Sequence, residues 1–129
     1  MKISRNRALA LGIVAIISIV AIQAFNSFAC YGHGLPDFLL VLGTFLLIPL
    51  LPAIISLVTA NPLRAVGACV LFAPWLGLAY YTDCVRPYAG GGASMIYVAV
   101  ILWGTPCSIF GALLTGPITR AFRIAVGGR

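Results

Sequence analysis

The chain has 129 residues, of which 62% are hydrophobic and only 8% are charged, and its formal net charge is +6. Soluble domains carry roughly 25% charged residues, and a small domain keeps much of its surface in contact with water. The composition therefore excludes an ordinary soluble enzyme, a disordered segment and a soluble nucleic-acid-binding module. It predicts a protein that lies in a membrane, with lipid and not nucleic acid as its surroundings.

Four segments are long enough and apolar enough to cross a bilayer. No Asp, Glu, Lys, Arg or His occurs in residues 8–29, 38–63, 65–82 and 87–119. A helix needs about 20 mainly apolar residues to cross the hydrocarbon core, where every backbone polar group must be satisfied within the protein. We therefore predict an all-α membrane protein, a four-transmembrane-helix bundle that forms one integral membrane domain over residues 1–129. The spans are expected near 8–28, 38–58, 65–81 and 94–115.

The first span follows a basic start formed by Lys2, Arg5 and Arg7. A basic start before an apolar run is also typical of a cleaved signal peptide, and the Ser-Phe-Ala at residues 27–29 resembles a cleavage site. The long run, the second hydrophobic segment soon after it and the even number of spans favour a retained first span.

The loops after spans 1 and 3 each contain one cysteine, Cys30 and Cys84. With four spans, both loops face the same oxidising compartment. We therefore predict a Cys30–Cys84 disulfide that joins the outer ends of spans 1 and 3. Other side chains in or next to these loops are candidates for binding a ligand, namely Tyr31, His33, Asp37, Asp83, Arg86 and Tyr88.

A metal site in these loops would draw on Cys30, His33 and Cys84, since thiolate and imidazole are good metal ligands. A cysteine in a disulfide cannot be a thiolate ligand, and the chain has no Cys-x-x-Cys pair. We therefore expect no metal and no cofactor. Asp37 has a structural explanation, because proline and a carboxylate both suit the first turn of a helix, and Pro36 precedes it at the start of span 2.

Prolines lie deep inside three of the spans, at Pro49, Pro52, Pro74 and Pro106. Each proline removes a backbone donor and frees the carbonyl four residues earlier. Broken helices of this kind form substrate sites in transporters, but proline is also common in ordinary membrane helices. We interpret these four prolines as helix kinks.

Small residues recur at every fourth position in the last two spans. They are Ala65, Cys69, Ala73 and Gly77 in span 3, and Gly104, Ser108, Ala112 and Gly116 in span 4. Small residues at this spacing let helix backbones approach closely. We predict that spans 3 and 4 pack along these stripes, or that one stripe faces another protein.

Two further predictions concern the tryptophan residues of the spans and the segment that follows Pro117. Trp75 and Trp103 lie near the middle of their spans, and we expect both to be packing anchors whose indole N–H finds an internal partner. After Pro117, the basic and apolar residues predict either a short interfacial helix or a continuation of span 4.

The positions of the basic residues predict the orientation of the chain. Seven of the eight fall on one side of the four spans, and Arg86 alone falls on the other. The seven are Lys2, Arg5, Arg7, Arg64, Arg120, Arg123 and Arg129. Short loops rich in Lys and Arg stay in the cytoplasm. We therefore expect both termini to be cytoplasmic in a multi-pass protein of the bacterial inner membrane.

The scarcity of reactive side chains decides between the classes of function. Proton-coupled carriers need an ionisable group inside the membrane, and the predicted spans contain none. A thiol relay needs pairs of cysteines, whereas each outer loop supplies one. We expect a small nonenzymatic protein that acts through protein contacts in the bilayer, as an accessory or assembly subunit or as an immunity-type protector against a membrane-acting toxin. The partner would be another membrane protein or a second copy. The alternatives are a small transporter or channel subunit and, third, a thiol redox protein of the periplasmic face.

Overall fold

The computed structural model describes residues 2–30, 32, 34–82 and 96–127, and nearly all of them are helical. Within these described ranges, four helical segments are long and apolar enough to cross a membrane, which agrees with the predicted all-α class and with the predicted number of spans. They are Arg5–Ala29, Leu35–Leu57, Leu63–Tyr80 and Val98–Ala121. The predicted limits differ from these by a few residues, chiefly because the fourth segment extends further toward the C-terminus.

Two of the four segments contain a stretch of wider, π-helical backbone. The first consists of helix α1 (Arg5–Phe25) followed by η1 (Asn26–Cys30). The second consists of α2 (Leu35–Val41), η2 (Leu42–Leu46) and α3 (Leu47–Leu57). The third and fourth segments are formed by α4 (Leu63–Tyr80) and α5 (Ile96–Ala121).

The prolines explain part of this irregularity. Pro49 cannot donate to the carbonyl of Phe45, which lies in η2, and π-helical turns are found where the regular bonding pattern is interrupted. The helices nevertheless continue through Pro52, Pro74 and Pro106. All four predicted kink positions therefore lie within helices, and the backbone changes its bonding pattern beside the first of them.

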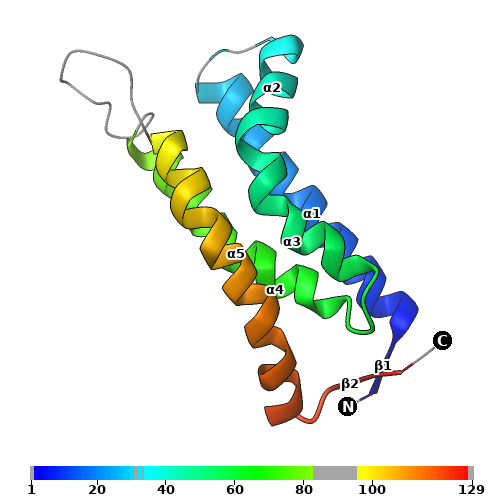
Figure 1. Ribbon diagram of the computed structural model, residues 1–129. Helices are drawn as coiled ribbons and strands as arrows, with labels where there is room; N and C mark the ends of the chain where they lie inside the picture. Colours follow the sequence, from blue (N-terminus) through cyan, green and yellow to red (C-terminus); the bar gives the residue numbers. More distant parts are fainter. Residues whose placement is uncertain (1, 31, 33, 83–95, 128–129) are drawn as a thin grey trace.

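Helix α4 contacts α1, α3 and α5, and α3 contacts α1, α4 and α5 (Figure 1). The most extensive contact of α4 is with α5. The core consists of small and apolar side chains, and its largest fully buried members are Phe72, Leu46, Leu76 and Val100. Large apolar side chains also cover the outside of the bundle, as expected for a protein surrounded by lipid tails.

Both ends of the described chain meet at one end of the bundle. Strand β1 (Lys2–Ser4) pairs in parallel with β2 (Ala125–Gly127), which lies just beyond α5 (Figure 1). The turn at residues 58–62 lies at the same end, where Arg5 Nη2 donates to the Thr59 carbonyl at 3.3 Å. We call this the basic end. Six described basic side chains belong to it, namely Lys2, Arg5, Arg7, Arg64, Arg120 and Arg123.

Helix α5 continues through Pro117, which decides between the two predictions for the C-terminal segment. The helix ends at Ala121, and Arg123, two residues later, has left-handed backbone with a φ of 55°. The amide of Ile124 donates to the Thr119 carbonyl at 2.7 Å, and Arg123 N donates to the Arg120 carbonyl at 3.0 Å. These two bonds form the Schellman pattern that closes a helix.

The prediction that Trp103 is a packing anchor is wrong, because 61% of this side chain is exposed. The next residue, Gly104, is the one that faces α4, where it lies against the ring of Phe72. A step of one residue turns about 100° around a helix, so Trp103 points away from that contact. Trp75, by contrast, is half-buried and packs against the core.

Candidate functional site

Most of the residues that the sequence predicts to bind a ligand lie outside the described residues. These are Tyr31, His33, Asp83, Arg86 and Tyr88, together with Cys84. The Cys30–Cys84 disulfide therefore stays a prediction, with Cys30 at the last position of η1. Asp37 lies in the first turn of α2 and is exposed. In the described part of the chain, no group of three or more His, Cys, Asp or Glu side chains could hold a metal.

Buried polar side chains join α1 and η1 to α4 near the end of the bundle that lies opposite the basic end. Gln23 Nε2 donates to Ser27 Oγ at 2.9 Å, and Asn26 Nδ2 donates to the Leu76 carbonyl at 3.4 Å. The rings of Phe25 and Tyr80 lie beside this polar group, with centroids 5.5 Å apart. These hydrogen bonds link Gln23 to Ser27 and Asn26 to the backbone of α4, and the second of them holds η1 against α4.

The closest approach between α4 and α5 occurs at Gly67 and Gly111. A Cβ on Gly67 would lie 2.6 Å from the Gly111 carbonyl oxygen, and a Cβ on Gly111 would lie 2.9 Å from the carbonyl carbon of Gly67. Neither position has room for a side chain. The hydroxyl of Thr115 also lies against Gly67, and it donates to the Gly111 carbonyl within α5 at 2.8 Å. Sequence reasoning missed both glycines, since they lie outside the two four-residue stripes.

The predicted stripe of span 4 faces α4 along its whole length. Gly104 lies against Phe72, and Gly116 lies against the guanidinium of Arg64. Ser108 and Ala112 between them are buried.

The predicted stripe of span 3 divides into two parts. Ala65 and Cys69 are buried in the core, and Ala73 is half-buried. Gly77 is exposed, and a Cβ built on it would meet no atom within 4 Å. The stripe therefore leaves the interior of the chain as it runs away from the basic end.

Gly77 belongs to a continuous exposed face of α4, formed by Val70, Pro74, Gly77, Leu78 and Tyr81. Their spacing of three and four residues places them on one side of the helix. The opposite side carries Cys69, Phe72 and Leu76, which are all buried. Pro74 also lacks the N–H that would bond to the Val70 carbonyl on this face. We call these five residues the exposed α4 face.

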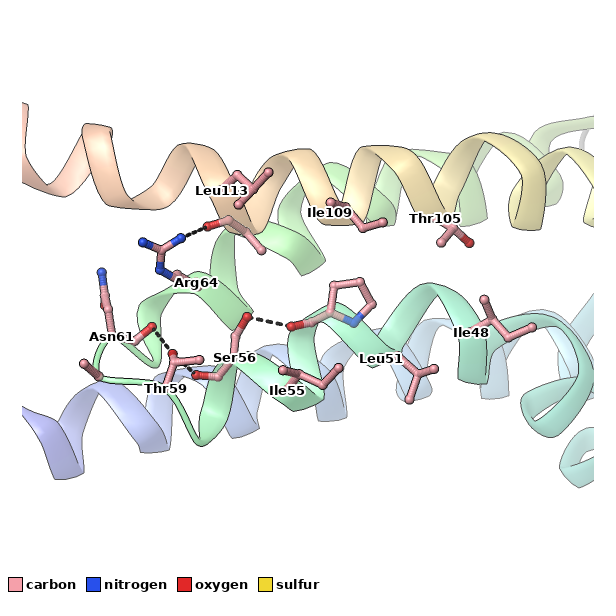
Figure 2. Close-up of a pocket in the computed structure, with 13 residues that line it drawn as sticks. Ile48, Leu51, Ile55, Ser56, Thr59, Asn61, Arg64, Thr105, Ile109 and Leu113 are labelled. Atoms are coloured by element: carbon pink, nitrogen blue, oxygen red, sulfur yellow. Dashed lines mark hydrogen bonds between the residues drawn. The ribbon is translucent and has the colours of Figure 1, made fainter.

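A hollow surface, the α3–α5 groove, lies beside the basic end and has a volume of about 730 Å³. Figure 2 shows residues of α3 on one side and residues of α5 on the other, with Arg64 near the 58–62 turn and Ile48 and Thr105 at the far end. The walls are mainly apolar. The lining residues are Ile48, Leu51, Pro52, Ile55, Ser56, Thr59, Ala60, Asn61, Arg64, Thr105, Ile109, Ala112 and Leu113.

Most polar side chains of the groove bond to nearby backbone. Ser56 Oγ donates to the Pro52 carbonyl at 2.6 Å, and Thr59 Oγ1 donates to the Ser56 carbonyl at 2.6 Å. Asn61 Oδ1 accepts from the amide of Leu63 at 3.2 Å and so supports the start of α4. These groups therefore shape the turn and do not select a ligand.

Arg64 is the charged residue of the groove. Its Nη1 donates to the Ala112 carbonyl on α5 at 3.2 Å (Figure 2). Gly116 leaves room beside the guanidinium, because a Cβ there would lie 2.9 Å from Nη2. Among the described residues, the one carboxylate side chain is Asp37, which lies at the other end of the bundle and cannot neutralise Arg64. The sequence indicated only that Arg64 marks a side of the membrane.

The chain matches no family of proteins, no curated protein and no solved structure.

Proposed function

We propose that this chain is a nonenzymatic, multi-pass protein of a bacterial inner membrane, with both termini cytoplasmic, that acts through contacts with another membrane protein. The gathering of basic side chains at one end supports the orientation. Lys2, Arg5 and Arg7 precede α1, Arg64 follows the 58–62 turn, and Arg120 belongs to the last turn of α5. Basic residues at span ends favour the cytoplasmic side.

The orientation is tested with reporter fusions at the C-terminus. A reporter that works only in the cytoplasm should be active, and one that works only in the periplasm should be silent. The reverse result would contradict the proposed orientation.

The observation that carries the proposed contact is the open space around Gly77. Membrane helices gain nothing from hiding apolar surface from lipid, so their association depends on close packing at small residues. The chain uses this device internally at Gly67 and Gly111, whereas Gly77 is left in the middle of an exposed apolar face. We propose that a helix of the partner packs on the exposed α4 face. The partner is a subunit that the chain helps to assemble, a toxin that it blocks, or a second copy.

The contact is tested with Gly77→Leu, which adds bulk to the exposed α4 face. Gly43→Leu is a matched control, because Gly43 is also exposed and a Cβ there would also meet nothing within 4 Å. In a mild detergent extract, the wild-type protein and G43L should migrate as a complex larger than one chain. G77L should migrate as a single chain. A complex of unchanged size in G77L would contradict the proposal.

A second set of measurements addresses the alternatives. Substrate flux into liposomes that contain only the purified chain would favour a small transporter or channel subunit. Oxidation of the Cys30 and Cys84 thiols to a disulfide, with transfer of the two electrons and two protons to a membrane quinone to give the quinol, would favour a redox protein of the periplasmic face.

A further inference from the structure

The α3–α5 groove has the length of one leaflet of a bilayer. On α3, its lining extends from Ile48 to Ser56, and on α5 from Thr105 to Leu113. At a rise of 1.5 Å per residue, each wall is about 12 Å long. The hydrocarbon core is about 30 Å thick, so one leaflet contributes about 15 Å. The groove therefore extends from the basic end to about the middle of the predicted membrane.

The groove is mainly apolar at one end and carries a charged side chain at the other, and a phospholipid has the same division between its acyl chains and its headgroup. At the far end, the walls contain Thr105 and are otherwise formed by apolar side chains such as Ile48, Leu51 and Ile109, which suit an acyl chain. At the basic end, the lining contains Arg64, whose counter-ion is not supplied by the described residues. A guanidinium has five N–H donors in a fork that matches phosphate, and partly buried charges are normally paired.

We propose that the α3–α5 groove binds one anionic phospholipid of the cytoplasmic leaflet. The Arg64 guanidinium bonds to the lipid phosphate, while one acyl chain lies between α3 and α5 against Leu51, Ile55 and Ile109. The remaining basic side chains at this end attract an anionic headgroup over a zwitterionic one. This site is independent of the proposed partner contact, which uses a face of α4 outside the groove.

The volume favours a lipid over a helix of another protein as the occupant. A helix with its side chains is about 10–12 Å across, and docking it would require a much longer surface. The 730 Å³ of the groove lies within the range of about 300–1,000 Å³ that is typical of sites for small ligands.

The first test uses the wild-type protein in detergent and two photoreactive lipids with identical acyl chains. One is a phosphatidylglycerol and the other a phosphatidylethanolamine, and the labelled peptides are identified by mass spectrometry. We expect phosphatidylglycerol to label residues 48–55 and 105–113, with excess unlabelled phosphatidylglycerol as an effective competitor. Inorganic phosphate should not compete, because it lacks the acyl chain. Equal labelling by both lipids, or labelling of α1 in place of the groove, would overturn the proposal.

The second test uses variants that either remove the charge of Arg64 or fill the groove with a larger side chain. Arg64→Gln should lower labelling by phosphatidylglycerol about tenfold, as expected for a lost charge-assisted hydrogen bond. Arg7→Gln removes one of the exposed charges that attract the headgroup without bonding to it, so it should lower labelling by a clearly smaller factor than R64Q. Unchanged labelling in R64Q would refute the role of Arg64.

Because Arg64 also bonds to the Ala112 carbonyl, R64Q could fail to fold, and a variant that fills the groove provides an independent measurement. Ile109→Trp adds bulk to the wall and should compete with the acyl chain for space, so labelling should fall. Phe110→Trp is the control, since Phe110 is exposed and does not line the groove. Equal labelling in I109W and F110W would refute the placement of the acyl chain.

Discussion

Gly67 and Gly77 lie on the same helix and have opposite surroundings. At Gly67, the backbone of α5 is so close that no side chain would fit, whereas the space around Gly77 is open. The comparison shows that a small residue in a membrane helix indicates a possible close approach without indicating which neighbour makes it. In this chain, α5 is the neighbour at Gly67, and we propose a helix of another protein at Gly77.

The difference follows from how α4 is surrounded. Near the basic end, it packs against α5 at Gly67 and against α1 at Ala65, whose Cβ would lie 3.1 Å from a Cβ on Gly12. Further along, its contact with α1 is made through the Leu76 carbonyl and the ring of Tyr80. Along the second half of α4, Phe72 and Leu76 are buried, whereas the exposed α4 face on the other side of the helix is not covered by any of the described residues.

The largest expected effect concerns the predicted Cys30–Cys84 disulfide, which would hold the far end of α4 against α1. The intact mass measured under non-reducing conditions should be two hydrogens lower than the mass measured after reduction. The chain-entropy relation gives about 4 kcal/mol for a loop of this length, as an upper estimate of what Cys84→Ser would cost in stability. An oxidised sample with the full complement of thiol hydrogens would show that no bridge forms.

The next effect compares the two glycines directly. Gly67→Ala should lower the free energy of unfolding by about 1–3 kcal/mol, because the new methyl group would overlap with the backbone of α5. Gly77→Ala should leave it unchanged or raise it by up to about 1 kcal/mol, since alanine is the better helix former. Unfolding of both variants in detergent measures the difference. Equal free energies of unfolding in the two variants would contradict the difference inferred between Gly67 and Gly77.

A smaller effect concerns the polar contact that positions the second half of α4. Asn26→Leu removes the hydrogen bond to the Leu76 carbonyl and should cost about 0.6–1 kcal/mol, which is typical of such bonds within membranes. Ser18→Ala serves as the control, because Ser18 is exposed and bonds within its own helix. A loss in S18A as large as that in N26L would show that Asn26 has no special role in holding α1 to α4.

The spans and the gathering of charge were predictable from the sequence, because both depend on local composition. The uninterrupted apolar runs give the four helical segments, and Pro36 and Asp37 lie in the first turn of α2 as expected. Pairing of β1 with β2 was not predictable, since it joins short segments from opposite ends of the chain that have no strand pattern of their own.

The candidate sites were predictable only in part. Gly77 belongs to a stripe that the sequence shows, but α4 contains small residues in several registers, so the pattern alone could not assign Gly67 to α5. The prediction for Trp103 was wrong for the same reason, because the sequence does not show which side of α5 faces α4. The α3–α5 groove combines the 58–62 turn with three helices, and only their packing brings Arg64 next to Ala112.

The most direct test of the proposed contact is a photo-crosslinking scan along α4 in living cells, with one photoreactive residue at a time. Positions 70, 74, 77, 78 and 81 should crosslink to a second polypeptide, and the buried positions 68, 72 and 76 should not. The efficiency should therefore rise and fall with the helical period. Crosslinks of equal efficiency on both sides of α4, or none on the exposed α4 face, would contradict a partner at Gly77.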